Sequence, residues 1–160
     1  MAQTTTARPY TAAEERIGSI AIRYMSRLNK LLYRLSGGRL FGKWMRGGAI
    51  GILGHRGRKS GQMFSSPLVY MPDGERLIVI ASKGGMSKHP LWYLNLRANP
   101  DCEFEIGSTK RPYRARTASP EEKRAYWPRI LAMNPDFDAY QARTTRDIPV
   151  VVLEPRGAAA

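Results

Sequence analysis

The chain is poor in the residues that cross-link a fold or hold a metal ion. Its 160 residues include one cysteine, Cys102, and two histidines, His55 and His89. A single cysteine cannot form an internal disulfide, so we expect a reducing compartment. These three residues do not have the spacing of a zinc site, and we expect no metal.

Long hydrophobic runs are also missing. The longest cover residues 77–81 and 148–153, whereas a membrane-spanning helix needs roughly 20 apolar residues. The N-terminus shows no apolar segment of the kind found in a signal peptide. We therefore expect a cytoplasmic protein that at most lies on the inner face of the cell membrane.

Acidic residues are scarce relative to basic ones. The chain holds 26 Lys and Arg against 13 Asp and Glu, a net charge of +13, and its 42% of hydrophobic residues suffice for one folded domain. Residues 1–60 carry 12 basic and 2 acidic residues, so most of the excess lies there. This charge favours an anionic partner: nucleic acid, a membrane surface or an acidic small molecule.

A basic amphipathic helix is predicted over residues 14–36, between a segment expected to be disordered (1–13) and the pair Gly37-Gly38. The domain that it opens is expected to run from residue 14 to residue 155, followed by a disordered tail (156–160). The apolar stripe of this helix contains Ile17, Ile20, Ala21, Tyr24, Leu28, Leu31, Leu32 and Leu35. Three interpretations stay open: the stripe packs on the core, it meets anionic lipid, or the helix binds nucleic acid.

Short strands separated by turns dominate the rest of the chain. We predict strands over residues 49–53, 64–71, 76–82, 101–106, 110–118 and 148–153, and helices over 91–99 and after the capping box that begins at Ser119. The strands form hairpins, which favours an antiparallel α+β or mainly β barrel with packed helices over a parallel sheet. In the hairpin of residues 101–118, Glu105 should face Lys110 and Asp101 should face Arg114. The strand over residues 148–153 is apolar on both faces and should be central.

Standard catalytic motifs are absent, and with two histidines a Ser–His pair has little support. An enzyme of this sequence would therefore take its reactive atom from an organic cofactor. The turn at residues 57–61 is one candidate site, because its bracketing glycines let backbone N–H groups converge beside two cations and a hydroxyl, which suits phosphate or carboxylate. The alternative is an ordinary basic turn before a strand.

A second candidate site is the loop of residues 82–90, which leaves a strand and enters a helix. Gly84-Gly85 permits close approach of the backbone to a flat ring, and the helix N-terminus favours an anion. Trp92 and Asn95 share one face of that helix. They would form the wall of a ring site, or else Trp92 belongs to the core and Asn95 caps a loop.

Several ordered motifs between about Arg23 and Pro155 together resemble the deazaflavin-dependent nitroreductase family. They are Gly57-Arg58-Lys59-Ser60-Gly61-Gln62, Ser66-Pro67-Leu68-Val69-Tyr70, Ala81-Ser82-Lys83-Gly84-Gly85, His89-Pro90-Leu91-Trp92-Tyr93-Leu94-Asn95-Leu96-Arg97-Ala98-Asn99-Pro100, Tyr140-Gln141-Ala142-Arg143-Thr144 and Ile148-Pro149-Val150-Val151-Val152-Leu153-Glu154-Pro155. The resemblance implies a split β-barrel of the flavin-reductase, FMN-binding-like type. It also implies that reduced coenzyme F420, a deazaflavin with a phospholactyl-polyglutamate tail, gives a hydride to a quinone, a nitroaromatic or another conjugated acceptor.

The resemblance also implies roles for individual residues. The tail should be held by Arg58, Lys59 and Ser60. The cofactor groove should be lined by Ser66, Pro67, Leu68, Val69, Ile80, Ala81, Ser82, Lys83, Gly84 and Gly85, and the ring walled by Leu91, Trp92, Tyr93, Leu94 and Asn95. Phe137 and Tyr140 should lie over the substrate, and Tyr140 or Ser82 should orient the acceptor or supply its proton.

Two residues depart from the family pattern. Phe64 stands where an arginine is usual, so one tail cation is missing, and Phe137 replaces a frequent tyrosine, which weakens the case for nitro reduction more than for quinone reduction. The cations favour F420 over FMN. The alternative function is a non-catalytic F420- or lipid-binding barrel. Nucleic acid is the least supported partner, because the clearest hairpin has an acidic strand.

Overall fold

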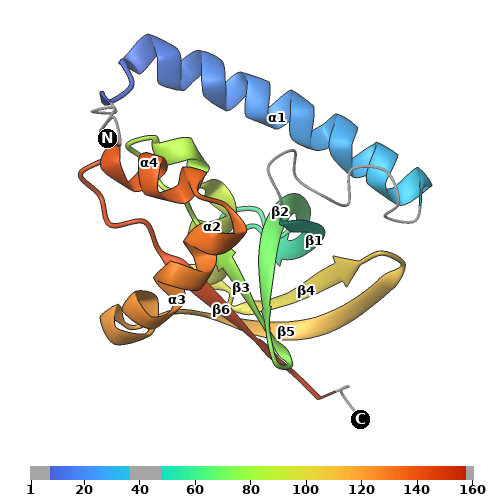
Figure 1. The fold of residues 1–160 in the computed structure, drawn as a ribbon. Helices are drawn as coiled ribbons and strands as arrows, with labels where there is room; N and C mark the ends of the chain where they lie inside the picture. The colour runs from blue at the N-terminus through green and yellow to red at the C-terminus, as the bar shows by residue number, and fades with distance from the viewer. Residues whose placement is uncertain (1–7, 37–47, 158–160) are drawn as a thin grey trace.

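Six antiparallel strands form a closed barrel in this computed structural model, which describes residues 8–36 and 48–157. The strands are β1 (Ala49–Arg56), β2 (Met63–Asp73), β3 (Arg76–Ile80), β4 (Asp101–Ile106), β5 (Thr109–Thr117) and β6 (Val150–Pro155). Their order around the barrel is β1-β2-β3-β6-β5-β4 (Figure 1). All six predicted strands are present, and the predicted split-barrel fold is confirmed.

The pairing of β4 with β5 has the predicted register. Glu105 lies opposite Lys110 and Asp101 lies opposite Arg114. Asp101 and Arg114 form an ion pair of 3.1 Å, while Lys110 reaches diagonally to Glu103 at 3.2 Å. Opposite charges across this exposed hairpin therefore support its register.

Strand β6 lies between β3 and β5 and is buried on both faces, which confirms its predicted central place. Val151 and Leu153 belong to a cluster with side chains from all six strands, which fills the barrel interior. Val150 and Val152 point the other way, into a second cluster outside the barrel. Because successive side chains of β6 point to opposite faces, this one strand contributes to both hydrophobic clusters.

Three helices cover the barrel. From α2 (Leu91–Ala98), the side chains of Trp92, Tyr93 and Leu96 enter the interior cluster. The outer cluster takes Tyr126 and Ile130 from α3 (Pro120–Met133) and Phe137 from α4 (Asp136–Ala142). The capping box predicted at Ser119 is present. Between β3 and α2, a single 3-10 turn, η1 (Lys83–Gly85), lies against α4.

The predicted basic helix is α1 (Ala12–Leu35). It begins two residues before its predicted start, because Thr11 accepts a hydrogen bond from the backbone N–H of Glu14 and the Glu14 carboxylate accepts one from Thr11. The stretch expected to be disordered is shorter accordingly, and its residues 1–7 lie outside the described part, as does the Gly37-Gly38 pair.

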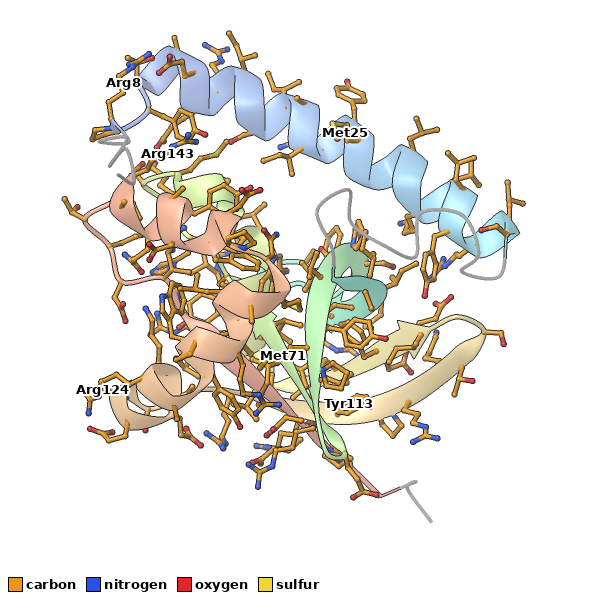
Figure 2. The ribbon with its side chains drawn as sticks, viewed as in Figure 1. Arg8, Met25, Met71, Tyr113, Arg124 and Arg143 are labelled. Atoms are coloured by element: carbon orange, nitrogen blue, oxygen red, sulfur yellow. The ribbon has the colours of Figure 1, made fainter. Side chains whose placement is uncertain are left out.

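Contacts near its two ends hold α1 to the rest of the molecule. Near the N-terminal end, Glu15 accepts hydrogen bonds from the N–H and the hydroxyl of Ser87, at 2.6 and 2.8 Å. Near the C-terminal end, the Tyr33 hydroxyl accepts the N–H of Gly107 at 2.7 Å. The helix thus spans from the side of α4 to the β4–β5 hairpin (Figure 1), with Arg143 under its first turns and Met25 midway along it (Figure 2).

The apolar stripe of α1 does not pack on the core. The large side chains Ile17, Ile20, Tyr24, Leu28, Leu31 and Leu35 are between 47% and 76% exposed. Other residues form the face toward the barrel. Near the N-terminal end an added Cβ on Gly18 would lie 2.7 Å from the Met86 methyl carbon and Ser19 contacts the Met86 sulfur, and near the C-terminal end Tyr33 is buried. The core-packing interpretation of the stripe is therefore wrong. No helix among residues 8–36 and 48–157 combines the length and apolar character needed to cross a bilayer.

Candidate cofactor site

The basic turn at residues 57–61 follows β1 and is closed by its own backbone. The Gly57 N–H donates to the Gln62 carbonyl at 2.8 Å, and the Gly61 N–H donates to the Gly57 carbonyl at 2.9 Å. The side chains of Arg58, Lys59 and Ser60 are exposed. Within the described part of the chain, no group accepts a hydrogen bond from the N–H of Lys59 or Ser60. Two N–H donors beside two cations suit a phosphate or carboxylate.

A chain of hydrogen bonds joins this turn to α2 and β2. The Arg58 N–H donates to Asn95 Oδ1 at 3.1 Å, and Asn95 Nδ2 lies 3.1 Å from His55 Nδ1. On the far side of the ring, His55 Nε2 lies 3.1 Å from Ser66 Oγ. Three predicted cofactor residues, Arg58, Ser66 and Asn95, are therefore brought together by a buried histidine. Sequence patterns pointed to His55 only as a possible metal ligand and did not reveal this role.

The proton positions in this chain follow from the donors at its ends. The Arg58 N–H can only donate, which fixes Asn95 Oδ1 toward it and Nδ2 toward the imidazole. Burial lowers the pKa of His55 from 6.5 to about 4, so the ring is neutral at pH 7. Since Asn95 Nδ2 donates to Nδ1, the ring hydrogen is on Nε2 and is donated to Ser66 Oγ.

The buried imidazole should make stability depend on pH. Between pH 6.5 and 4, His55 is protonated in the unfolded chain but stays neutral in the folded chain. The free energy of unfolding therefore falls as the pH falls through this range. The expected loss is about 2–3 kcal/mol, at 1.36 kcal/mol per pKa unit. Urea unfolding at pH 7 and pH 4.5 should show this slope for the wild type and for Met63→Ser, a change at an exposed residue that keeps the histidine and Phe64, and a smaller one for His55→Asn. An unchanged slope in His55→Asn would contradict the assignment.

The second predicted segment, residues 82–90, is held in place by Arg146. Its guanidinium donates to the carbonyl oxygens of Ser82, Met86 and Ala81 at 2.6, 2.8 and 3.2 Å. Arg146 also lies 3.2 Å from His89 Nδ1. This arginine was missed, because it stands about 60 residues further along the chain and forms no local motif with the loop.

The loop is a second concentration of positive charge. Burial lowers the pKa of Lys83, and the charges of Arg146 and Lys88 lower it further, against an opposing effect of Glu15. Burial also lowers the pKa of Arg146. An anionic group bound near this loop would relieve both effects, which agrees with a cofactor that carries acidic groups.

The close approach expected at Gly84-Gly85 is made by the protein itself. Gly85 has a φ of +78°, and an added Cβ would lie 2.5 Å from the Tyr140 carbonyl oxygen. The loop therefore lies directly against α4. The Phe137 and Tyr140 rings of α4 meet edge to face, with centroids 5.9 Å apart. Ser82 and Tyr140, both predicted to act on the acceptor, thus come from segments in contact.

Other predicted cofactor residues have different degrees of access. Ser66, Pro67, Leu68 and Val69 are half-buried on β2, Leu91 is exposed, and Leu94 is half-buried, whereas Ile80, Ala81, Trp92, Tyr93 and Phe137 are buried. The structure agrees with the alternative: Trp92 belongs to the core, and Asn95 holds the turn at residues 57–61 through the Arg58 N–H. Contact of either residue with a ring stays a prediction.

The described residues contain cavities but no cluster of metal ligands. No group of three or more His, Cys, Asp or Glu residues within the described ranges could hold a metal ion. Two cavities of about 210 and 220 Å³ lie beside Tyr93 and Thr117. The lining of these two cavities does not include the turn at residues 57–61, but His89 of the loop lines one of them and Tyr93, a predicted ring-wall residue, lines both.

Comparison with known proteins agrees with this fold and site. The profile of the family described as F420H(2)-dependent quinone reductase matches residues 25–155. A Mycobacterium tuberculosis protein provisionally named as such a reductase is 48% identical over 105 residues, 66% of this chain and 88% of the relative. Another from that organism, named F420H(2)-dependent quinone reductase, is 37% identical over 134 residues, 81% of this chain and 89% of the relative.

A solved structure described as an F420-H2 dependent reductase, FDR-A, has a TM-score of 0.61 and 35% sequence identity, and the match covers 66% of this chain and 93% of that one. The barrel, the cationic turn and the family match over residues 25–155 lead to one conclusion, which the sequence resemblance had anticipated. This chain belongs to the F420H(2)-dependent quinone reductase family.

Proposed function

We propose that this chain reduces a quinone with electrons from reduced coenzyme F420. The observation that carries the proposal is the turn at residues 57–61, where the N–H groups of Lys59 and Ser60 lie beside two exposed cations. These groups fit the phosphate and carboxylates of the F420 tail. The names of the relatives support the same cofactor and acceptor.

The residues of the chain bind and orient the cofactor and the acceptor, while the cofactor supplies a hydride when it is bound. Arg58, Lys59 and Ser60 hold the tail, and the half-buried segment from Ser66 to Val69 lines the groove beside it. The acceptor lies near the contact of η1 with α4. There the hydroxyl of Tyr140 or Ser82 stabilises the negative charge that develops on a quinone oxygen and supplies its proton.

The activity is tested by mixing the pure protein with reduced F420 and menadione and following the absorbance of the oxidised cofactor. Oxidation that depends on both the protein and the quinone is the expected result. Binding of F420 without turnover on any quinone or nitroaromatic would favour the alternative of a non-catalytic binding barrel. Failure to bind F420 at micromolar concentration would overturn the proposal.

Removal of the tail cations should weaken F420 binding selectively. Each hydrogen bond to a charged group contributes about 1.5–3 kcal/mol, so the loss of both cations in Arg58→Ala combined with Lys59→Ala should raise the Kd for F420 by roughly 100-fold or more. The Kd for a deazaflavin riboside without the tail should stay unchanged. The control is Lys110→Ala with Arg111→Ala on the β4–β5 hairpin, two exposed cations away from the turn. Equal losses for both ligands, measured by fluorescence quenching, would argue against tail binding here.

We also propose that α1 attaches the protein to an anionic membrane surface. Its apolar stripe is exposed, as the side chains of Tyr24, Leu28 and Leu31 show. Arg16 and Arg23 are exposed on the same helix, whose acidic residues are confined to Glu14 and Glu15 in the first turn. Apolar side chains flanked by cations are typical of a helix that lies in the headgroup region of a bilayer.

The membrane proposal is tested by combining Tyr24→Ser, Leu28→Ser and Leu31→Ser. Loss of three half-inserted apolar side chains, at about 1 kcal/mol each, should lower partitioning onto anionic vesicles roughly 100-fold. Co-sedimentation with phosphatidylglycerol vesicles measures this loss, and phosphatidylcholine vesicles test the need for anionic lipid. Met63→Ser on β2 is the control, since Met63 is also exposed. Full co-sedimentation of the triple variant, or none of the wild type, would contradict the proposal.

A further inference from the structure

The hydrogen-bonded chain through His55 connects the two halves of the proposed cofactor site. At one end, Asn95 holds the backbone of Arg58 and so fixes the turn that would receive the acidic tail. At the other end, the imidazole reaches Ser66 on β2, in the segment that would line the groove for the ring. The buried His55 side chain therefore contacts both Asn95, which holds the turn, and Ser66, which lies on the groove segment.

The directions of these hydrogen bonds determine which donors remain available to a ligand at the Ser66 end and at the turn. Ser66 Oγ accepts the hydrogen of His55 Nε2, so the hydrogen of the Ser66 hydroxyl must point away from the imidazole. Ser66 is half-buried, and within residues 8–36 and 48–157 no further hydrogen bond of its hydroxyl is present. The hydroxyl hydrogen is thus available to a ligand in the proposed groove. At the turn, the Arg58 N–H is used, and those of Lys59 and Ser60 remain for an anion.

The surroundings of His55 hold the ring in this orientation. The side chain is 3% exposed, and its ring stacks on Phe64 with centroids 6.0 Å apart and an angle of 24° between planes. A protonated ring would place an N–H donor against the N–H donor of Asn95, so only the neutral form fits this arrangement. Phe64, stacked on the imidazole, therefore helps to fix the plane of the ring.

We propose that His55 is a positioning residue for both parts of the cofactor: through Asn95 it fixes the turn that binds the acidic tail, and through Ser66 it presents a hydroxyl hydrogen to an acceptor atom of the deazaflavin ring. This inference rests on the proposed binding of F420 at this site. It goes beyond the proposed function in assigning a role to a residue that touches neither the tail nor the acceptor.

Two variants separate the two roles. In His55→Asn the side-chain oxygen replaces Nδ1, so the bond to Asn95 is kept and the bond to Ser66 is lost. In His55→Gln the amide nitrogen takes the position of Nε2, so the bond to Ser66 is kept and the bond to Asn95 is lost. Fluorescence titration gives the Kd for F420 and for the deazaflavin riboside that lacks the tail. The ratio of the two constants reports the tail contribution alone.

His55→Asn should weaken both ligands by the same factor, about 3- to 10-fold for one hydrogen bond, and leave the ratio unchanged. His55→Gln should weaken F420 by about 10-fold and leave the riboside unchanged. The ¹⁵N–¹H signal of Arg58 should move in His55→Gln but not in His55→Asn. Adding Ser66→Ala to His55→Asn should cause no further loss.

Three results would overturn the inference while leaving the proposed function intact: wild-type affinity in both variants, equal losses for both ligands in His55→Gln, or additive losses when Ser66→Ala joins His55→Asn. Should a His55 variant fail to fold, Ser66→Ala alone tests the ring half, because it must weaken both ligands equally. A wild-type protein that does not bind F420 would instead overturn the proposed function.

Discussion

Gly85→Ala is expected to destabilise the protein by at least about 3 kcal/mol and to abolish most quinone reduction. A φ of +78° costs a non-glycine residue roughly 1–2 kcal/mol. In addition, the new Cβ would lie 2.5 Å from the Tyr140 carbonyl oxygen and 3.0 Å from the Tyr140 Cα. Both contacts are with backbone, so η1 and α4 must separate. Urea unfolding and the rate of F420H2 oxidation with menadione measure the two effects.

Gly84 provides a matched control. It also has a positive φ, +63°, but an added Cβ would meet no atom within 4 Å. Gly84→Ala should therefore cost only about 1–2 kcal/mol from the backbone conformation. The difference between the two variants isolates the contact of η1 with α4. Equal losses of stability in Gly84→Ala and Gly85→Ala would show that this contact contributes nothing.

Arg146→Lys should be the second severe substitution. The guanidinium donates to three carbonyl oxygens at once, those of Ala81, Ser82 and Met86. An ammonium group keeps the charge but cannot reproduce this planar arrangement of donors. Loss of two such bonds, at about 1.5–3 kcal/mol each, should lower the free energy of unfolding by about 3 kcal/mol or more. The loop should also lose protection, so that the amides of Gly85 and Met86 exchange with D₂O faster.

Arg124→Lys is the control for this substitution. Arg124 is exposed on α3 (Figure 2). It pairs with Glu121 at 3.3 Å, an interaction of the kind that contributes at most about 0.5 kcal/mol. Unfolding by heat should therefore distinguish the two arginine variants clearly. Wild-type melting and wild-type amide exchange in Arg146→Lys would show that the loop keeps its shape without the guanidinium.

The strands and their register could be predicted because the forces that define them act between near neighbours. Alternating apolar residues marked β4, and a continuous apolar run marked β6. The short turn at Gly107 fixed which residues of β4 and β5 face each other. The capping box at Ser119 acts over three residues. Such patterns need no knowledge of the rest of the fold.

The support of the site could not be predicted in the same way. The Arg58 N–H meets Asn95, and Arg146 meets Ser82, across 37 and 64 positions of the chain. A lone histidine or arginine leaves no periodic pattern, so its partner appears only once the barrel is closed. The apolar stripe of α1 was found correctly, but amphipathicity alone does not say whether a stripe faces protein or solvent.

The attachment of the turn at residues 57–61 to α2 has a consequence for protein engineering. Its five residues form no self-sufficient module, since the group that holds the Arg58 backbone, Asn95, belongs to another element. Grafted onto a different barrel, the turn would keep its charges but lose the hydrogen bond from the Arg58 N–H to Asn95 and the histidine that contacts Asn95. On the proposed function, a designer who wants to transfer deazaflavin binding would transplant His55, Ser66 and Asn95 together with the loop.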